Sequence, residues 1–318
     1  MLAGLSLAGC GGELSALDPA GPAAHQLALV WWWMLGVSAV VIAGVGLLAA
    51  LAFRKNRGKP WSPRLSHGVI VAGGVGLPVA AITALLIYGL PAGESMRTAA
   101  PDAYVVDVRG HQWWWEVRYP DQTHGQLISA NEIHIPAGRP VTLRISTADV
   151  IHSFWVPRLG GKIDAIPGRV NALHLQADAP GEYAGVCAEF CGAQHARMHI
   201  TVYAHDEAEL AVRRAALARA HAAADRLMAH TGFVQQCVAC HSVDPTRAGT
   251  EALATGPNLA GVAQRRTLGA GTLPNTPGNM SRWLFEHQLL KPGNRMPQDS
   301  LTQADRQTLA DLLEVRHD

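Results

Sequence analysis

The chain has 318 residues, which suits two or three domains better than one. Its 26 lysine and arginine residues nearly balance 25 aspartate and glutamate residues, so the formal net charge is only +1. A nearly neutral chain lacks the positive field typical of nucleic-acid-binding proteins, and we expect no nucleic-acid partner. The mean hydropathy is slightly positive, which is unusual for a soluble chain and points to apolar segments.

The N-terminus contains the sequence Leu7-Ala8-Gly9-Cys10. A short apolar run that ends in small residues and cysteine resembles a bacterial lipoprotein signal, which predicts a lipid on Cys10. The basic residues that normally begin a signal peptide are missing, so an unmodified cysteine is the alternative. We therefore expect residues 1–25 to be a lipoprotein signal and N-terminal segment.

Two runs without charged residues follow, from Leu27 to Phe53 and from Gly68 to Leu90. A helix of the first length extends about 40 Å, enough to cross a hydrocarbon core of about 30 Å. A short basic segment over residues 54–59 separates the runs and is expected on the cytoplasmic side. Residues 26–92 are therefore predicted to form a transmembrane helical hairpin. Glycines within the second run indicate either a docking face for a membrane partner or a helix irregularity.

Short segments rich in β-branched residues, separated by Pro and Gly turns, predict a β-sandwich or barrel over residues 93–206. The predicted strands are 104–108, 132–135, 141–145, 172–175 and 199–203. Residues 207–227 are rich in Ala, Arg and Glu, without Gly or Pro, which predicts a helical linker. Residues 228–318 are predicted to form a small helical domain.

Cys187, Cys191, His195 and Met198 lie within twelve residues. Thiolate, imidazole and thioether together suit copper, and two cysteines four apart could bridge two metal ions. His152 is the expected ligand from another strand, although a lone histidine is more often a buried structural residue. A disulfide or a zinc site would use the same cysteines, but neither explains Met198.

These motifs resemble the copper A domain of cytochrome c oxidase subunit II, with the match covering residues 26–206. The His152-Ser153-x-Trp155 segment and the aromatic segment Gly110-His111-Gln112-Trp113-x-Trp115 belong to the same resemblance. It implies a cupredoxin-like fold and two copper ions. The implied copper ligands are His152, Cys187, the Glu189 carbonyl, Cys191, His195 and Met198.

The same resemblance implies further roles and partners. The Glu189 side chain would face a magnesium site shared with oxidase subunit I, and Trp113 would be a surface aromatic residue through which electrons enter. One departure concerns the second apolar run, which lacks the acidic residue that many relatives place at the mouth of a proton channel.

Cys237-Val238-Ala239-Cys240-His241 matches the signature for covalent attachment of a c-type haem, with His241 as the proximal iron ligand. Met296, in a proline-flanked loop, is the expected sixth ligand, and Met280 is the alternative. Residues 228–318 resemble a class I cytochrome c. The segment Thr255-Gly256-Pro257 is similar to that family's loop, in which the proline carbonyl accepts a bond from the proximal histidine.

Together these features predict a multidomain membrane protein of a bacterial inner membrane, with its copper and haem domains on the periplasmic face. We expect an oxidase subunit that passes electrons from haem c through copper A to subunit I. Expected partners are the other oxidase subunits, membrane lipid and an electron donor such as a soluble cytochrome or an upstream respiratory complex. A membrane-anchored copper-delivery protein is the alternative, which the haem motif disfavours.

Overall fold

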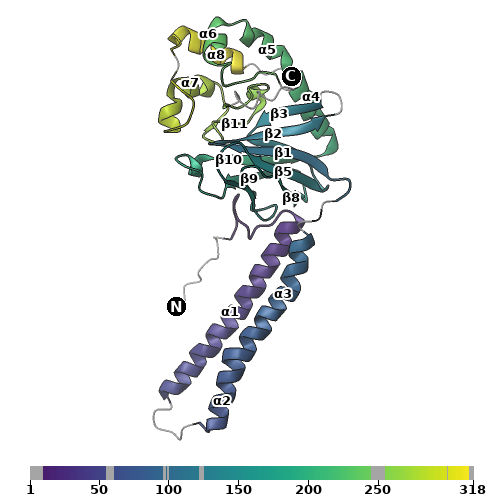
Figure 1. Cartoon of the computed structure of the whole chain (residues 1–318), viewed down its shortest axis with the longest axis vertical. Helices are drawn as coiled ribbons and strands as arrows, with labels where there is room; N and C mark the ends of the chain where they lie inside the picture. The colour runs from purple at the N-terminus through teal and green to yellow at the C-terminus, as the bar shows by residue number, and fades with distance from the viewer. Residues whose placement is uncertain are drawn as a thin grey trace, which may run out of the picture. The chain divides into compact units, whose positions relative to one another are not determined.

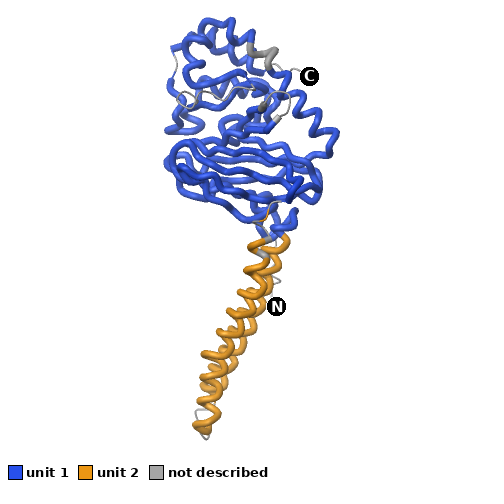
Figure 2. Tube along the Cα trace, turned by 45° about the vertical axis from the view of Figure 1, so that its right-hand side comes forward, with its two compact units in different colours: residues 1–24, 99–318 blue, residues 25–98 orange. Residues whose placement is uncertain are grey.

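The computed structural model describes residues 10–54, 61–95, 98, 100–121, 125–244, 255–298 and 300–314. Its contacts divide the chain into one unit of residues 25–98 and a second unit of residues 1–24 and 99–318 (Figure 2). The residues before Cys10 and the predicted basic segment after Arg54 lie outside the described residues, so neither prediction can be placed in the structure.

The unit of residues 25–98 is a helical hairpin. Helix α1 (Pro22–Arg54) runs beside a second helix that contains α2 (Pro63–Val71), a π-helical turn (Ala72–Gly76) and α3 (Leu77–Ser95) (Figures 1 and 2). Both are long and apolar enough to cross a membrane. The π-helical turn coincides with the glycines of the second run, which form α-helix poorly. The helix irregularity predicted from these glycines is therefore present as the π-helical turn.

Two five-stranded sheets form a β-sandwich in the other unit (Figure 1). The first sheet contains, in order, β3 (Gly125–Ala130), β2 (Trp114–Asp121), β1 (Tyr104–His111), β5 (Val141–Thr147) and β8 (Asn171–Leu175). The second contains β4 (Glu132–Pro136), β10 (His199–His205), β9 (Gly181–Cys187), β6 (His152–Trp155) and β7 (Ile163–Ala165). All five predicted strands are confirmed, and five further strands were missed.

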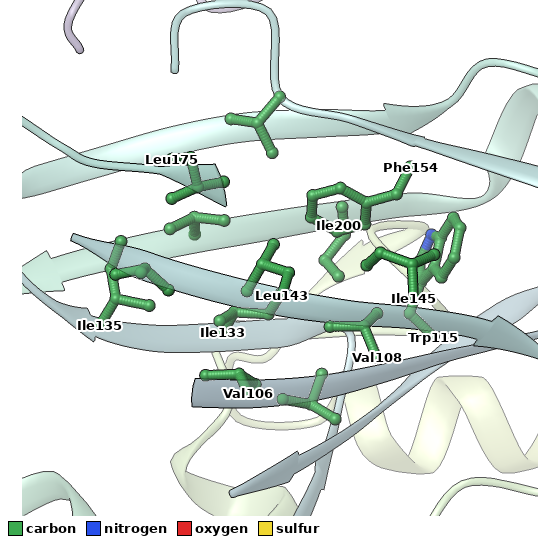
Figure 3. Close-up of a cluster of buried hydrophobic side chains, with 14 of the residues drawn as sticks. Val106, Val108, Trp115, Ile133, Ile135, Leu143, Ile145, Phe154, Leu175 and Ile200 are labelled. Carbon is green, nitrogen blue, oxygen red and sulfur yellow. The ribbon is translucent and has the colours of Figure 1, made fainter. Parts of the chain in front are cut away.

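Alternating burial explains why these segments pack as two layers. In β5, Val141, Leu143 and Ile145 are buried, whereas Thr142 and Arg144 point away from the core. Figure 3 shows apolar side chains from both sheets, among them Leu143 from the first and Phe154 from the second, meeting between the layers. β1 pairs in parallel with β5 and antiparallel with β2, so the chain between β1 and β5 forms a crossover connection.

Two helices follow the sandwich. Asp206 caps α4 (Glu207–Arg219) by accepting a hydrogen bond from the Glu209 amide at 2.8 Å. Helix α5 (His221–Met228) begins after a break at Ala220. The predicted linker is therefore helical, but its end does not act as a free spacer, because Leu227 is buried in the core of the domain that follows.

The C-terminal domain contains α6 (Thr231–Gln236), a 3₁₀ turn (Val262–Gln264), α7 (Asn279–Leu290) and α8 (Gln303–Glu314). Phe233 of α6 packs with Leu309 and Leu313 of α8 around the same core. A two-stranded ribbon, β11 (Thr267–Leu268) and β12 (Leu273–Pro274), adds a small β element that the expectation of a purely helical domain did not include. The tip of this ribbon reaches the sandwich, where the His199 amide donates to the Ala270 carbonyl at 3.2 Å.

Candidate metal and haem sites

The loop between β9 and β10 gathers the predicted copper ligands. Cys187 Sγ lies 3.8 Å from Cys191 Sγ and 3.9 Å from His152 Nδ1. Cys191 Sγ lies 3.7 Å from His195 Nδ1 and 3.9 Å from Met198 Sδ. The Glu189 carbonyl lies 3.3 Å from Cys187 Sγ. All six predicted groups therefore converge on one small volume.

Pairing between strands brings the distant ligand, His152, into this cluster. β6 begins at His152, and its Phe154 pairs with Cys187 at the end of β9. The Ala188 amide donates to the Ser153 carbonyl at 2.8 Å, which holds the start of the ligand loop against β6. The Cys187 amide donates to the Met198 carbonyl at 3.1 Å and closes the loop at its other end.

The two cysteines are free thiols. A disulfide requires an S–S distance of about 2.05 Å, far shorter than the 3.8 Å between Cys187 and Cys191. The hydrogen bond between the two thiols lowers the pKa of Cys187 and raises the pKa of Cys191, so one thiolate is favoured in this pair. Thiolate is the form that binds metal, and the ligand atoms of His152, Cys187 and Cys191 lie within 4.8 Å of one another.

Asp149 orients His152, a contact that sequence reasoning missed. Its carboxylate lies 2.9 Å from His152 Nε2 and also accepts hydrogen bonds from the Gln112 amide at 2.8 Å and the Val150 amide at 2.7 Å. Because Nε2 is occupied by the carboxylate, Nδ1 is the nitrogen that faces Cys187. An acidic residue three positions before a ligand histidine was the available signal.

Trp113, expected as a surface residue, is half-buried. Its indole Nε1 donates to the Cys191 carbonyl at 3.0 Å, and Gln112 Nε2 donates to the same carbonyl at 2.7 Å. The Arg295 guanidinium lies 5.9 Å from the centre of the Trp113 ring, within cation–π distance. Trp113 therefore keeps part of its surface exposed beside the C-terminal domain, and its role in electron entry stays a prediction.

A crevice in the C-terminal domain contains the predicted haem-binding residues. Cys237, Cys240, His241, Met280 and Met296 all line it. The His241 Nδ1 lies 2.7 Å from the Pro257 carbonyl, which can only accept, so Nδ1 carries the hydrogen and Nε2 is left as a metal ligand. The segment around Pro257 therefore orients the ring as foreseen.

Met296 is held at the crevice by its backbone. Its amide donates to Asn294 Oδ1 at 2.9 Å, and its carbonyl accepts from Gln288 Nε2 at 2.8 Å. Met280 is buried in α7 among the apolar core side chains. A methionine that packs in a helix core is less free to turn toward iron, so Met296 stays the predicted sixth ligand.

The crevice is shared by the two domains. Gln112, Trp113 and Trp114 from the sandwich line the same cavity as Cys240 and His241. A cavity with the haem motif in one wall and Trp113 in another places the two predicted redox sites next to each other.

Two predicted residues lie outside these clusters. The Glu189 side chain is exposed and accepts a hydrogen bond from the backbone amide of its neighbour Phe190 at 3.2 Å. The Cys10 carbonyl accepts from Ser15 Oγ at 2.6 Å, at the start of the segment that packs on the sandwich through Ala20. Lipidation of Cys10 stays a prediction.

Comparisons with known proteins find relatives of both the sandwich and the C-terminal domain. Residues 123–205 match the family described as cytochrome c oxidase subunit II, periplasmic domain, and residues 229–315 match cytochrome c. Cytochrome c oxidase subunit 2 of Alkalihalophilus pseudofirmus is 32% identical, with 92% of this chain and 88% of that protein aligned. The Bacillus subtilis protein of the same name is 31% identical over the same shares. The crystal structure of the periplasmic domain of oxidase subunit II from Bradyrhizobium japonicum is 32% identical over 37% of this chain and 94% of that chain, with a TM-score of 0.34.

Proposed function

Because this chain belongs to the cytochrome c oxidase subunit II family, we propose that it passes electrons from a fused c-type haem through a binuclear copper A centre to oxidase subunit I, where oxygen is reduced to water. The family makes it a subunit of an oxidoreductase complex. A subunit II domain implies copper, and a cytochrome c domain implies haem. The proposal concerns the route between them.

The donor set fits copper. Cys187 and Cys191 would supply thiolates shared by two ions, and His152, His195, Met198 and the Glu189 carbonyl would complete the ligand set. A mixture of thiolate, imidazole and thioether within one cluster is the ligand chemistry that copper prefers. Copper and haem would each supply reversible one-electron chemistry. The sandwich holds the ligand loop at both ends, so the ligands are positioned in advance.

The crevice fits a covalently bound haem. Cys237 and Cys240 would carry the thioether links, and His241 and Met296 would ligate the iron. Gly256 lies against the His241 ring, where a Cβ would come within 2.6 Å of Cε1, so only glycine leaves room for the ring. Arg265 is buried at the crevice, and its Nε has no hydrogen-bond partner among the described groups. A buried cationic donor of this kind suits a haem carboxylate.

One observation carries the proposed electron route. Trp113 lines the haem crevice and also donates a hydrogen bond to the Cys191 carbonyl in the copper-ligand loop. A single residue therefore contacts both predicted sites. We propose that Trp113 is the electron entry point of the copper domain and receives electrons from the fused haem.

Exposed apolar side chains near the ligand loop support a face for subunit I. Phe190 is 76% exposed, and Val150 and Ile151 are also exposed. Apolar side chains grouped around a metal loop mark a protein interface. Glu189 lies beside Phe190, where its carboxylate could complete a magnesium site with subunit I.

The two apolar helices support a membrane-anchored subunit, and we propose that both span a bacterial inner membrane with the sandwich on the periplasmic face. Lipid on Cys10 would add a second anchor. The electron donor to the fused haem is proposed to be a soluble cytochrome or an upstream respiratory complex.

Spectroscopy of the purified full-length subunit tests the function. We expect a mixed-valence binuclear copper signal together with the absorption band of a c-type haem. Haem without the binuclear copper signal would overturn the proposed electron route. Copper without covalent haem would favour a copper-delivery role.

A further inference from the structure

Lys291 is an unusual residue because its ammonium group is buried between two domains. The side chain is 3% exposed, and burial lowers its pKa to about 7, with Arg197 adding to the effect. Burying a cationic group is costly unless its hydrogens find acceptors. A lysine kept at such a position is expected to have partners that compensate for the lost water.

Three backbone carbonyls surround the ammonium. Lys291 Nζ donates to the carbonyls of Trp113 at 3.1 Å, Arg197 at 2.9 Å and Gly269 at 2.8 Å. An ammonium group has three hydrogens, so all three donors are satisfied. In the described part of the chain these partners include no carboxylate, which distinguishes the contact from an ordinary ion pair.

The partners show that the residue does more than cap its own helix. Lys291 follows α7, but none of the three carbonyls belongs to α7. Gly269 lies in the ribbon of the cytochrome domain, whereas Trp113 and Arg197 lie in the copper domain. The side chain therefore ties two segments of the copper domain to the cytochrome domain.

Both copper-domain segments belong to the proposed electron path. Trp113 donates its indole hydrogen to the Cys191 carbonyl, and Arg197 lies in the turn directly before Met198. The backbone on either side of Lys291 adds two further bonds to the same loop. Arg197 Nη1 donates to the Leu290 carbonyl at 2.6 Å, and Gln194 Nε2 donates to the Pro292 carbonyl.

We propose that Lys291 is a positioning residue. Its hydrogen bonds fix the cytochrome domain against the copper-ligand loop and hold Trp113 between the haem crevice and the copper site. The inference rests on the proposed function, because it assumes that electrons pass between these two sites. Its effect would be on the rate of transfer between domains, since Lys291 is neither a predicted copper ligand nor a predicted haem ligand.

The test uses Lys291→Met in the full-length subunit loaded with haem and copper. Removing a buried donor leaves its carbonyl acceptors unsatisfied and weakens the contact by on the order of tenfold or more. The helical connection keeps the domains near each other, so some docked molecules should persist. We expect electron transfer from haem to copper, after rapid photoreduction of the haem, to slow by about tenfold or more. The haem absorption band, the copper signal and both reduction potentials should stay as in the wild type.

A graded variant and a matched control sharpen the result. Lys291→Gln keeps two N–H donors without a charge, so it should slow transfer less than Lys291→Met. If the Lys291→Met variant fails to assemble, the haem-to-copper transfer rate of the Lys291→Gln variant tests the proposal instead. Arg282→Met removes an exposed cation of α7, the helix before Lys291, where Arg282 pairs with Glu286 at 3.0 Å, and should leave the rate unchanged.

Transfer rates within twofold of wild type in the loaded Lys291→Met and Lys291→Gln variants would overturn the proposed positioning role of Lys291. A wild-type subunit that binds haem but gives no binuclear copper signal would instead overturn the proposed function itself. The two failures are therefore distinguishable.

Discussion

Asp149 holds the His152 imidazole in place, so Asp149→Ala should loosen the copper site. The substitution removes the carboxylate that lies 2.9 Å from His152 Nε2 and accepts from the Gln112 and Val150 amides at 2.8 and 2.7 Å. His152 then loses the contact that leaves Nδ1 facing Cys187. The ring can rotate, and the ligand loop loses a fixed partner.

The expected magnitude follows from the role of this carboxylate. Removing a group that orients a metal-ligating histidine typically costs about 10- to 100-fold in metal affinity. At 25 °C that range corresponds to about 1.4–2.8 kcal/mol. Titration of the copper-loaded protein with a chelator, followed through the binuclear copper signal, measures this loss. The haem should stay covalently attached, because Asp149 is not a predicted haem ligand; its contact with the C-terminal domain is to Arg295, at 3.9 Å.

Asp107→Ala is the matched control. Asp107 also binds a side chain, accepting from Arg144 Nη2 at 2.7 Å on the exposed face of β1 and β5. An exposed pair of this kind contributes at most about 1 kcal/mol to stability and has no connection to the ligand loop. Equal copper retention in the Asp149→Ala and Asp107→Ala proteins would refute the orienting role of Asp149.

Three further predictions address the copper site, the haem site and the sandwich. Met198→Leu should change the copper reduction potential and slow electron transfer while the haem band stays intact; native copper spectra with full turnover would contradict its assignment as a ligand. Gly256→Ala should reduce or perturb haem incorporation, because the added Cβ would lie 2.6 Å from His241 Cε1, and a wild-type haem spectrum would disprove this clash. Burial and neighbouring His205 lower the pKa of His134 from 6.5 to about 3, so the folded chain favours the neutral ring. Stability should therefore fall as pH decreases from about 6.5 towards about 3, by up to about 1.4 kcal/mol per pH unit. His134→Phe should flatten this dependence in thermal denaturation, and an unchanged slope would argue against His134 as its source.

Local patterns were sufficient for much of the architecture. The uncharged runs predicted the two apolar helices, and alternation predicted strands such as β5. The five missed strands include β6 and β9, which carry His152 and Cys187. β6 has only four residues, HSFW, and β9, GEYAGVC, alternates in burial but carries Ala184 and Val186 rather than polar residues at outward positions, so neither shows a clear apolar–polar alternation in sequence.

The sequence by itself determined which reactive groups the chain offers: soft candidate copper ligands spaced along one loop, a haem attachment motif and two apolar spans. Spacing is informative there because the ligands of a single loop are held near one another by the covalent chain. Only the tertiary structure decided which distant groups meet them. Pairing of β6 with β9 brings His152 to Cys187, and docking of the C-terminal domain places Arg295 beside Trp113 and buries Lys291. Such contacts depend on strand register and on the packing of two domains, which short-range spacing does not encode.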